Sequence, residues 1–206
     1  MINDVKRRFT ELLNTSELSK VEFKRDQYRF DNDILKSQFI KDILCMANAS
    51  GDDSYVLLGI QCEKGKPREV VGIYSHHDSS YLEEIVNSII GEPIQFEYYT
   101  LNYMGKECAL LHIPPSKAKP HWPKKDYGIL KKHVFYTRRS SGNREASIQE
   151  IRDMFLGTIH ISDIALRKSR SGPHVIDELA DFSNDEREAI MNKMLKDIAP
   201  KIGGVT

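Results

Sequence analysis

The sequence has few cysteines and no long apolar run. Its 206 residues include three cysteines, Cys45, Cys62 and Cys108, and no C-x-x-C pair. An odd number of widely spaced cysteines is not typical of a disulfide framework or of a zinc knuckle, so we expect reduced thiols and a cytoplasmic location. No apolar run approaches the roughly 20 residues of a membrane helix, and the N-terminus lacks a signal-peptide core, so no membrane association is expected.

Two phosphate-binding fingerprints are also absent. The sequence contains neither G-x-x-x-x-G-K-[ST] nor G-x-G-x-x-G, the motifs in which a glycine-rich loop holds a nucleotide phosphate. The formal net charge is zero, but the charge is unevenly spread. Nine Lys or Arg and one acid lie between Lys117 and Arg144, whereas seven acids and three bases lie between Asp177 and Asp197. This asymmetry predicts a basic face and an acidic C-terminal tail.

The order of periodic segments predicts an α+β fold. Apolar spacing of three and four predicts helices, and short continuous or alternating apolar runs predict strands. Asp33 is the expected N-cap of one helix, and capping boxes at Ser80 and Ser147 are expected to open two others. The predicted helices cover about residues 3–15, 34–49, 80–91 and 147–156, and the predicted strands about 20–24, 55–60, 69–73, 94–103, 107–113 and 133–138.

These elements predict a mixed β-sheet with helices packed on it. We expect this domain to cover residues 1–157 and a helical, acidic C-terminal extension to cover residues 158–206.

The segment from Glu17 to Lys24 contains the pattern that most strongly indicates chemistry. In a strand, side chains alternate, so Glu22 and Lys24 point to one face, and Glu17 can fold back toward the same face. Two carboxylates beside a lysine can hold a hard divalent cation and place a positive charge against a phosphate. The same pattern also occurs by chance in charged chains, and the alternative is a plain ion pair between Glu22 and Lys24, of little energetic value if exposed.

A proline-rich basic loop covers residues 117–125. Its lysines, among them Lys119, Lys124 and Lys125, can contact phosphates, and Trp122, the only tryptophan, offers a ring on which an unpaired base can stack. The alternative is that Trp122 folds back onto the core.

Three arginines, Arg138, Arg139 and Arg144, lie between a predicted strand and a predicted helix. Arginines and hydroxyls near a helix N-terminus are typical of a phosphate-binding site. The alternative is a solvated turn.

In this order the pieces resemble the Schlafen/AlbA-like DNA-binding domain family. The resemblance covers about residues 15–157, and it depends on the order of the pieces, since each alone is common. It implies a mixed sheet with helices packed on it and a role on nucleic acid. The pieces are Glu17-x-x-x-x-Glu22-Phe-Lys24, Cys45-Met-Ala-Asn48-Ala-Ser-Gly51, Val56-Leu-Leu-Gly59-Ile60, Val71-Gly72-Ile73, Ile113-Pro-Pro-Ser116-x-x-Lys119-Pro120-His121 and Tyr136-x-Arg138-Arg139-Ser-Ser.

The resemblance also implies an activity. Schlafen proteins cleave structured RNA, notably tRNA, with three acids and a divalent metal. By this resemblance Glu17 and Glu22 would bind Mg²⁺ or Mn²⁺, and Lys24 would hold the scissile phosphate. Relatives usually have the third acid, an aspartate, just after the strand equivalent to residues 56–60. Here Glu63 is the candidate third ligand, with a shifted register, or the ligand is missing.

Three classes of function are compatible with these features. The first is a nucleic-acid-binding domain, with RNA favoured over DNA, that acts as a metal-dependent endoribonuclease. Because Schlafen cores carry two related lobes and this chain has one, a homodimer would restore the groove. The second is a non-catalytic DNA-binding or regulatory module, and the third is a protein-interaction role through the acidic tail.

Overall fold

The structure is a computed structural model that describes residues 2–17 and 20–158. The chain divides into two compact units, residues 1–154 and 155–206, and every strand of the described residues belongs to the first unit. The predicted C-terminal extension falls, apart from its first residue, outside the described residues. Within the described ranges, no helix is long and apolar enough to span a membrane.

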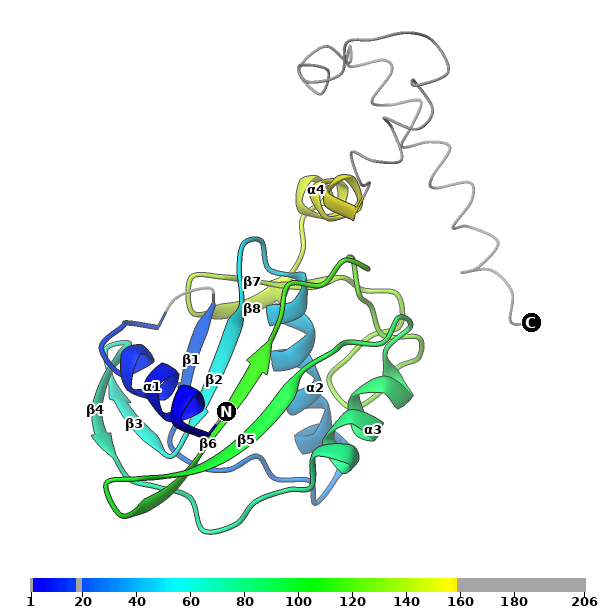
Figure 1. The fold of residues 1–206 in the computed structure, drawn as a ribbon. Coiled ribbons are helices and arrows are strands. Elements are labelled where there is room, and N and C mark those ends of the chain that lie inside the picture. Colours follow the sequence, from blue (N-terminus) through cyan, green and yellow to red (C-terminus); the bar gives the residue numbers. More distant parts are fainter. Residues whose placement is uncertain (1, 18–19, 159–206) are drawn as a thin grey trace, which may run out of the picture. The chain divides into compact units, whose positions relative to one another are not determined.

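A four-stranded sheet forms the centre of the first unit (Figure 1). Its strand order is β1 (Val21–Lys24), β2 (Ser54–Leu58), β6 (Lys106–Ile113) and β5 (Glu97–Tyr103). β1 runs parallel to β2, whereas the other neighbours are antiparallel. The predicted mixed sheet is therefore confirmed.

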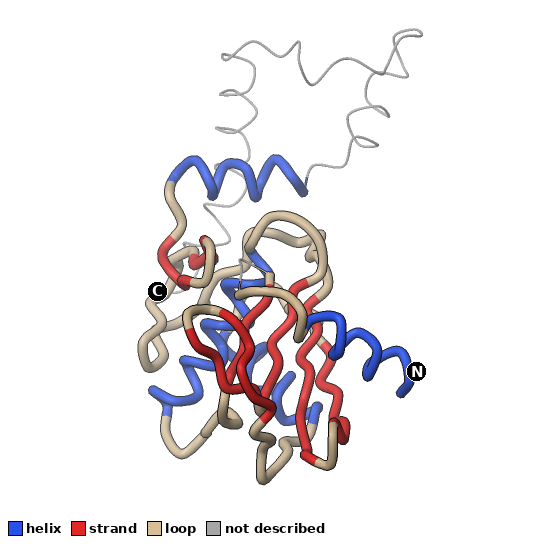
Figure 2. The backbone as a smooth tube through the Cα atoms, turned by 90° about the vertical axis from the view of Figure 1, so that its left-hand side faces the viewer, coloured by secondary structure: helices blue, strands red, loops and turns tan. Residues whose placement is uncertain are grey.

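Helices pack on both faces of this sheet. α1 (Ile2–Leu12) lies on one side of the strands, and α2 (Asp33–Asn48) and α3 (Ser79–Ile89) lie on the other (Figure 2). Because side chains alternate along β2, Val56 and Leu58 join the apolar cluster under α2 and α3, whereas Leu57 joins the cluster under α1. This double burial explains why the β2 segment is apolar without interruption.

Two hairpins and a fourth helix complete the described elements. β3 (Ile60–Glu63) pairs with β4 (Lys66–Val70), and β7 (Tyr136–Arg139) pairs with β8 (Gly142–Glu145). α4 (Ile148–Thr158) follows β8. The second hairpin differs from the sequence-based expectation, which placed only a turn between Arg138 and the last helix.

Helix starts test the predicted caps. The N-cap of α2 is Asn32, not Asp33, and its side chain accepts from the backbone N–H of Leu35 at 3.0 Å. α3 begins after Asp78, whose carboxylate accepts from two backbone N–H groups, and not at a capping box on Ser80. The box at Ser147 is confirmed, because Ser147 and Glu150 each accept the other's backbone N–H.

Gly59 allows the end of β2 to lie directly against the backbone of Val71 and Gly72. Its carbonyl accepts hydrogen bonds from the backbone N–H groups of Val71, at 2.8 Å, and Gly72, at 3.0 Å. Its φ is +92°, and a Cβ added there would lie 2.9 Å from the Cα of Gly72. A side chain at this position therefore meets backbone that cannot move aside.

We expect Gly59→Ala to destabilise the fold by about 2–3 kcal/mol or more, because it adds a backbone clash to an unfavourable φ. Gly105→Ala is the matched control, since Gly105 has a φ of +79° but nothing within 4 Å of an added Cβ. Urea unfolding of both variants measures the difference. If the two variants lose the same unfolding free energy, the close approach of Gly59 to Gly72 adds no destabilisation beyond that of the positive φ.

Candidate functional site

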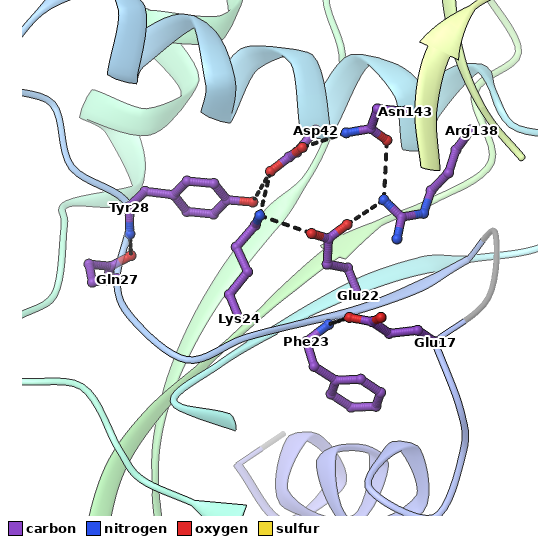
Figure 3. A network of polar contacts seen from close by, with 9 residues as sticks. All are labelled: Glu17, Glu22, Phe23, Lys24, Gln27, Tyr28, Asp42, Arg138 and Asn143. Atoms are coloured by element: carbon purple, nitrogen blue, oxygen red, sulfur yellow. Dashed lines mark hydrogen bonds and ion pairs between the residues drawn. The ribbon is translucent and has the colours of Figure 1, made fainter. Parts of the chain in front are cut away.

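β1 directs Glu22 and Lys24 to the face of the sheet that α2 covers. The predicted alternation is confirmed, because Val21 and Phe23 are buried and Glu22 and Lys24 point the other way. The Nζ of Lys24 lies 2.9 Å from the Oε1 of Glu22 and 2.9 Å from the Oδ2 of Asp42, a residue of α2 (Figure 3). One lysine thus bridges two carboxylates.

The β7–β8 hairpin closes this arrangement into a ring. The Nη1 of Arg138 donates to the Oε2 of Glu22, and also to the Oδ1 of Asn143 at 3.1 Å. The Nδ2 of Asn143 donates to the Oδ1 of Asp42 at 2.6 Å (Figure 3). We call Glu22, Lys24, Asp42, Arg138 and Asn143 the Glu22–Asp42 network. It contains two acids and two bases.

Burial makes this charge balance necessary. The side chain of Arg138 is 1% exposed, that of Asp42 11% and that of Glu22 15%. Burial alone would lower the pKa of Lys24, but Asp42 and Glu22 outweigh it, and the pKa of Lys24 is raised. Lys24 is therefore held as a cation, and it is not available as a neutral base.

Tyr28 extends the network. Its hydroxyl donates to the Oδ2 of Asp42 at 2.8 Å. Burial, and then the charge of Asp42, raise the pKa of Tyr28 well above its usual value. The phenol therefore stays protonated, and it remains a hydrogen-bond donor to the buried carboxylate.

The three predicted metal ligands are not gathered at one point. The Oε1 of Glu17 accepts from the backbone N–H of Phe23 at 3.4 Å, while the carboxylate of Glu22 is engaged by Lys24 and Arg138 (Figure 3). Glu63, at the exposed end of β3, pairs with Arg68 at 2.9 Å.

Over the described ranges, no group of three or more His, Cys, Asp or Glu could hold a metal ion. Ligation of Mg²⁺ or Mn²⁺ by Glu17, Glu22 and Glu63 therefore stays a prediction.

Several side chains of the basic loop contact other parts of the domain. The ring of Trp122 lies 5.9 Å from that of Phe135, and a Cβ added at Gly91 would come within 3.0 Å of it. Trp122 therefore packs against Phe135 and Gly91, and base stacking on its exposed part stays a prediction. The Nζ of Lys119 donates to the carbonyl of Ala49, and that of Lys124 to the carbonyl of Asn87 at 3.2 Å. Lys125 is exposed.

The three arginines have different surroundings. Arg138 is buried in the network, and the guanidinium of Arg144 pairs with the carboxylate of Glu150. This pairing and the N–H of Ser147 lower the pKa of Glu150 to about 2. Arg139 is exposed and lines a pocket of about 210 Å³ together with Ser50. Of the three, only Arg139 faces a pocket without an ion pair to a described residue.

Sequence reasoning missed three polar residues of this region: Asp42, Asn143 and Lys20. Asp42 had a usable signal, because it interrupts a stretch of α2 in which Phe39, Ile40 and Ile43 are all buried. A lone acid inside such a stretch requires a partner. Asn143 and Lys20 had no comparable signal, since each lies in a polar segment.

We expect Glu22→Gln to lower the free energy of unfolding by about 3 kcal/mol, because it removes the carboxylate charge that pairs with the buried guanidinium of Arg138. Glu63→Gln is the matched control and should change stability by less than about 0.5 kcal/mol, since its ion pair is exposed. Urea unfolding at pH 7 measures both. A loss for Glu22→Gln no larger than that of the control would exclude a stabilising role for the network.

Comparisons with known proteins bear on the fold and the family. A model of the family described as Schlafen, AlbA_2 matches residues 17–147. No curated protein matches the chain.

Among solved structures, the DIP2311 protein from Corynebacterium diphtheriae is similar, with 13% identity and a TM-score of 0.49. The match covers 82% of this chain and 34% of that one, so the chain spans about a third of that protein's structure. The N-terminal domain of a RecG-related protein from Nitrosomonas europaea is similar with 21% identity and a TM-score of 0.42, over 68% of this chain and 92% of that one.

The family match includes the pieces that carry the chemistry of this region. It begins at Glu17, contains the whole Glu22–Asp42 network and ends at Ser147, after the β7–β8 hairpin. It covers more than half of the chain. The chain therefore belongs to the Schlafen, AlbA_2 family, which indicates a function related to nucleic acid.

Proposed function

We propose that this domain binds nucleic acid, RNA in preference to DNA, through the basic side chains of residues 117–144, and that binding needs no metal ion. The observation that carries the proposal is the distribution of charge partners. Glu22 and Asp42 are neutralised inside the protein by Lys24 and Arg138, whereas most of the basic side chains in this stretch have no carboxylate partner among the described residues.

Five of these side chains keep their positive charge available. The Nζ groups of Lys119 and Lys124 donate to backbone carbonyls, which carry no formal charge. Three further cations make no ion pair with any residue in the described part of the chain: Lys117, Lys125 and Arg139. Uncompensated cations attract phosphates and release their counterions, so they support salt-dependent binding.

RNA is the first ligand to test, because the resemblance to Schlafen proteins points to structured RNA. Metal-dependent cleavage by Glu17, Glu22 and Glu63 is the competing prediction. Glu22→Gln is a poor probe of it, since the same substitution is expected to destabilise the fold. Glu17→Gln is better, because the carboxylate of Glu17 accepts one long hydrogen bond, at 3.4 Å.

The test is binding of the full chain to tRNA and to single- and double-stranded DNA in EDTA, over about 50–200 mM salt. We expect affinity for tRNA to fall steeply with salt. The double variant Lys125→Gln/Arg139→Gln should lower the slope by about two, because each phosphate contact contributes about one. The control is Lys6→Gln, which removes an exposed charge of α1. Its slope should match that of the unmodified chain.

The outcomes separate the function classes. Absence of binding to every nucleic acid at the lowest salt would exclude the proposal. If the chain cleaves tRNA in Mn²⁺ and Glu17→Gln does not, the metal-dependent nuclease is the correct function and metal-independent binding is overturned. The mass of the complex by light scattering tests the predicted homodimer independently.

A further inference from the structure

Two lysines that are far apart in the sequence converge on one carbonyl oxygen. The Nζ of Lys20, in the turn before β1, lies 3.0 Å from the oxygen of Ala49, and the Nζ of Lys119, in the basic loop, lies 2.6 Å from the same atom. Ala49 is the C-cap of α2. Both lysines are partly buried. We call them the Lys20–Lys119 pair.

The C-terminus of α2 cannot neutralise this pair. A helix C-terminus carries roughly half an elementary negative charge, whereas two ammonium groups carry about two positive ones. Two carboxylates, Asp52 and Asp53, lie near Lys20, but Asp53 already contacts His112 at 3.2 Å and the hydroxyl of Tyr55 at 3.2 Å. Neither ammonium forms an ion pair with a carboxylate of the described residues.

The protonation behaviour of the pair reflects this deficit. Burial, and then the positive charge of Lys119, lower the pKa of Lys20 to about 8, although Asp52 and Asp53 act in the opposite direction. Burial also lowers the pKa of Lys119. Cations that lose stability through burial and mutual repulsion gain it from an added anion.

We propose that Lys20 and Lys119 together bind one phosphate group of the nucleic acid at the C-terminal end of α2. This rests on the proposed function and adds the contact point. Each ammonium has three donors and uses one on Ala49, so each keeps donors for a phosphate oxygen. The shared carbonyl holds the two groups in place before the ligand arrives, which lowers the entropy lost on binding.

The neighbouring pocket supports the same location. Ser50 follows Ala49 directly, and it lines the pocket of about 210 Å³ together with Arg139 and Ser140. Two carboxylates also line this pocket: Glu150, which pairs with Arg144, and Asp153, which accepts from Gln149. A hydroxyl and an exposed guanidinium therefore lie beside the end of α2. Successive phosphate groups of one nucleic-acid strand could contact the Lys20–Lys119 pair and Arg139. The simpler alternative is that the two lysines only stabilise the helix C-terminus.

The pH dependence of tRNA binding separates these alternatives. Between pH 7 and 9, Lys20 should lose most of its charge, so affinity should fall about five- to tenfold, whereas ordinary lysines stay protonated. Lys20→Gln should bind about five- to tenfold more weakly at pH 7 and show a weaker dependence on pH than the unmodified chain. Lys20→Arg should keep the affinity at both pH values, because a guanidinium does not titrate there. Lys6→Gln should follow the unmodified chain.

A second measurement keeps this inference distinct from the proposed function. At matched ionic strength and pH 7, inorganic phosphate should raise the Tm of the unmodified chain relative to chloride, and this gain should be absent in Lys20→Gln. Binding of tRNA with a flat pH profile in the unmodified chain would overturn the phosphate site and leave the function standing. If the unmodified chain does not bind tRNA but still gains Tm in phosphate, the proposed function is overturned and an anion site at the lysine pair remains. If the unmodified chain shows neither tRNA binding nor the Tm gain, the function and the phosphate site are both overturned.

Discussion

The buried contact between Arg138 and Glu22 is the interaction on which the rest of the site depends. A guanidinium that is 1% exposed is stable only beside a counter-charge, and Glu22 supplies it from 116 residues earlier in the chain. Asn143 then links the same hairpin to Asp42 of α2. The β7–β8 hairpin is thereby attached to both β1 and α2, although it shares no strand pairing with the central sheet over the described residues.

This use of charge divides the polar residues into two groups. Acids and bases of the Glu22–Asp42 network neutralise each other, and their geometry is closed by hydrogen bonds in which every member participates. The lysines around the C-terminus of α2 contact carbonyl oxygens, so their charge remains available to an anion. Cations in this arrangement can attract phosphates.

The sequence predicted the parts of the fold that depend on local pattern. The apolar run of β2, the helix α2 and the shared orientation of Glu22 and Lys24 follow from periodicity, and all three are confirmed. The β7–β8 hairpin was missed, because Gly142–Glu145 has no apolar alternation and its pairing with β7 is stabilised by contacts of Arg138 and Asn143 with distant residues. Trp122 was left open between base stacking and packing. Its contact with the ring of Phe135 could not be foreseen from the sequence, and base stacking stays a prediction.

The sequence by itself determined the strands and helices of the mixed sheet and the shared orientation of Glu22 and Lys24, because strand and helix periods act over a few neighbouring positions. The order of its motifs carried the resemblance to the family, which the family match confirms. The tertiary structure decided which charges meet. Lys24 between Glu22 and Asp42, and Lys20 beside Lys119, are juxtapositions of segments that chain folding brings together over tens of residues. The energy of a charge depends on its burial and on its partners, and neither can be read from the order of residues.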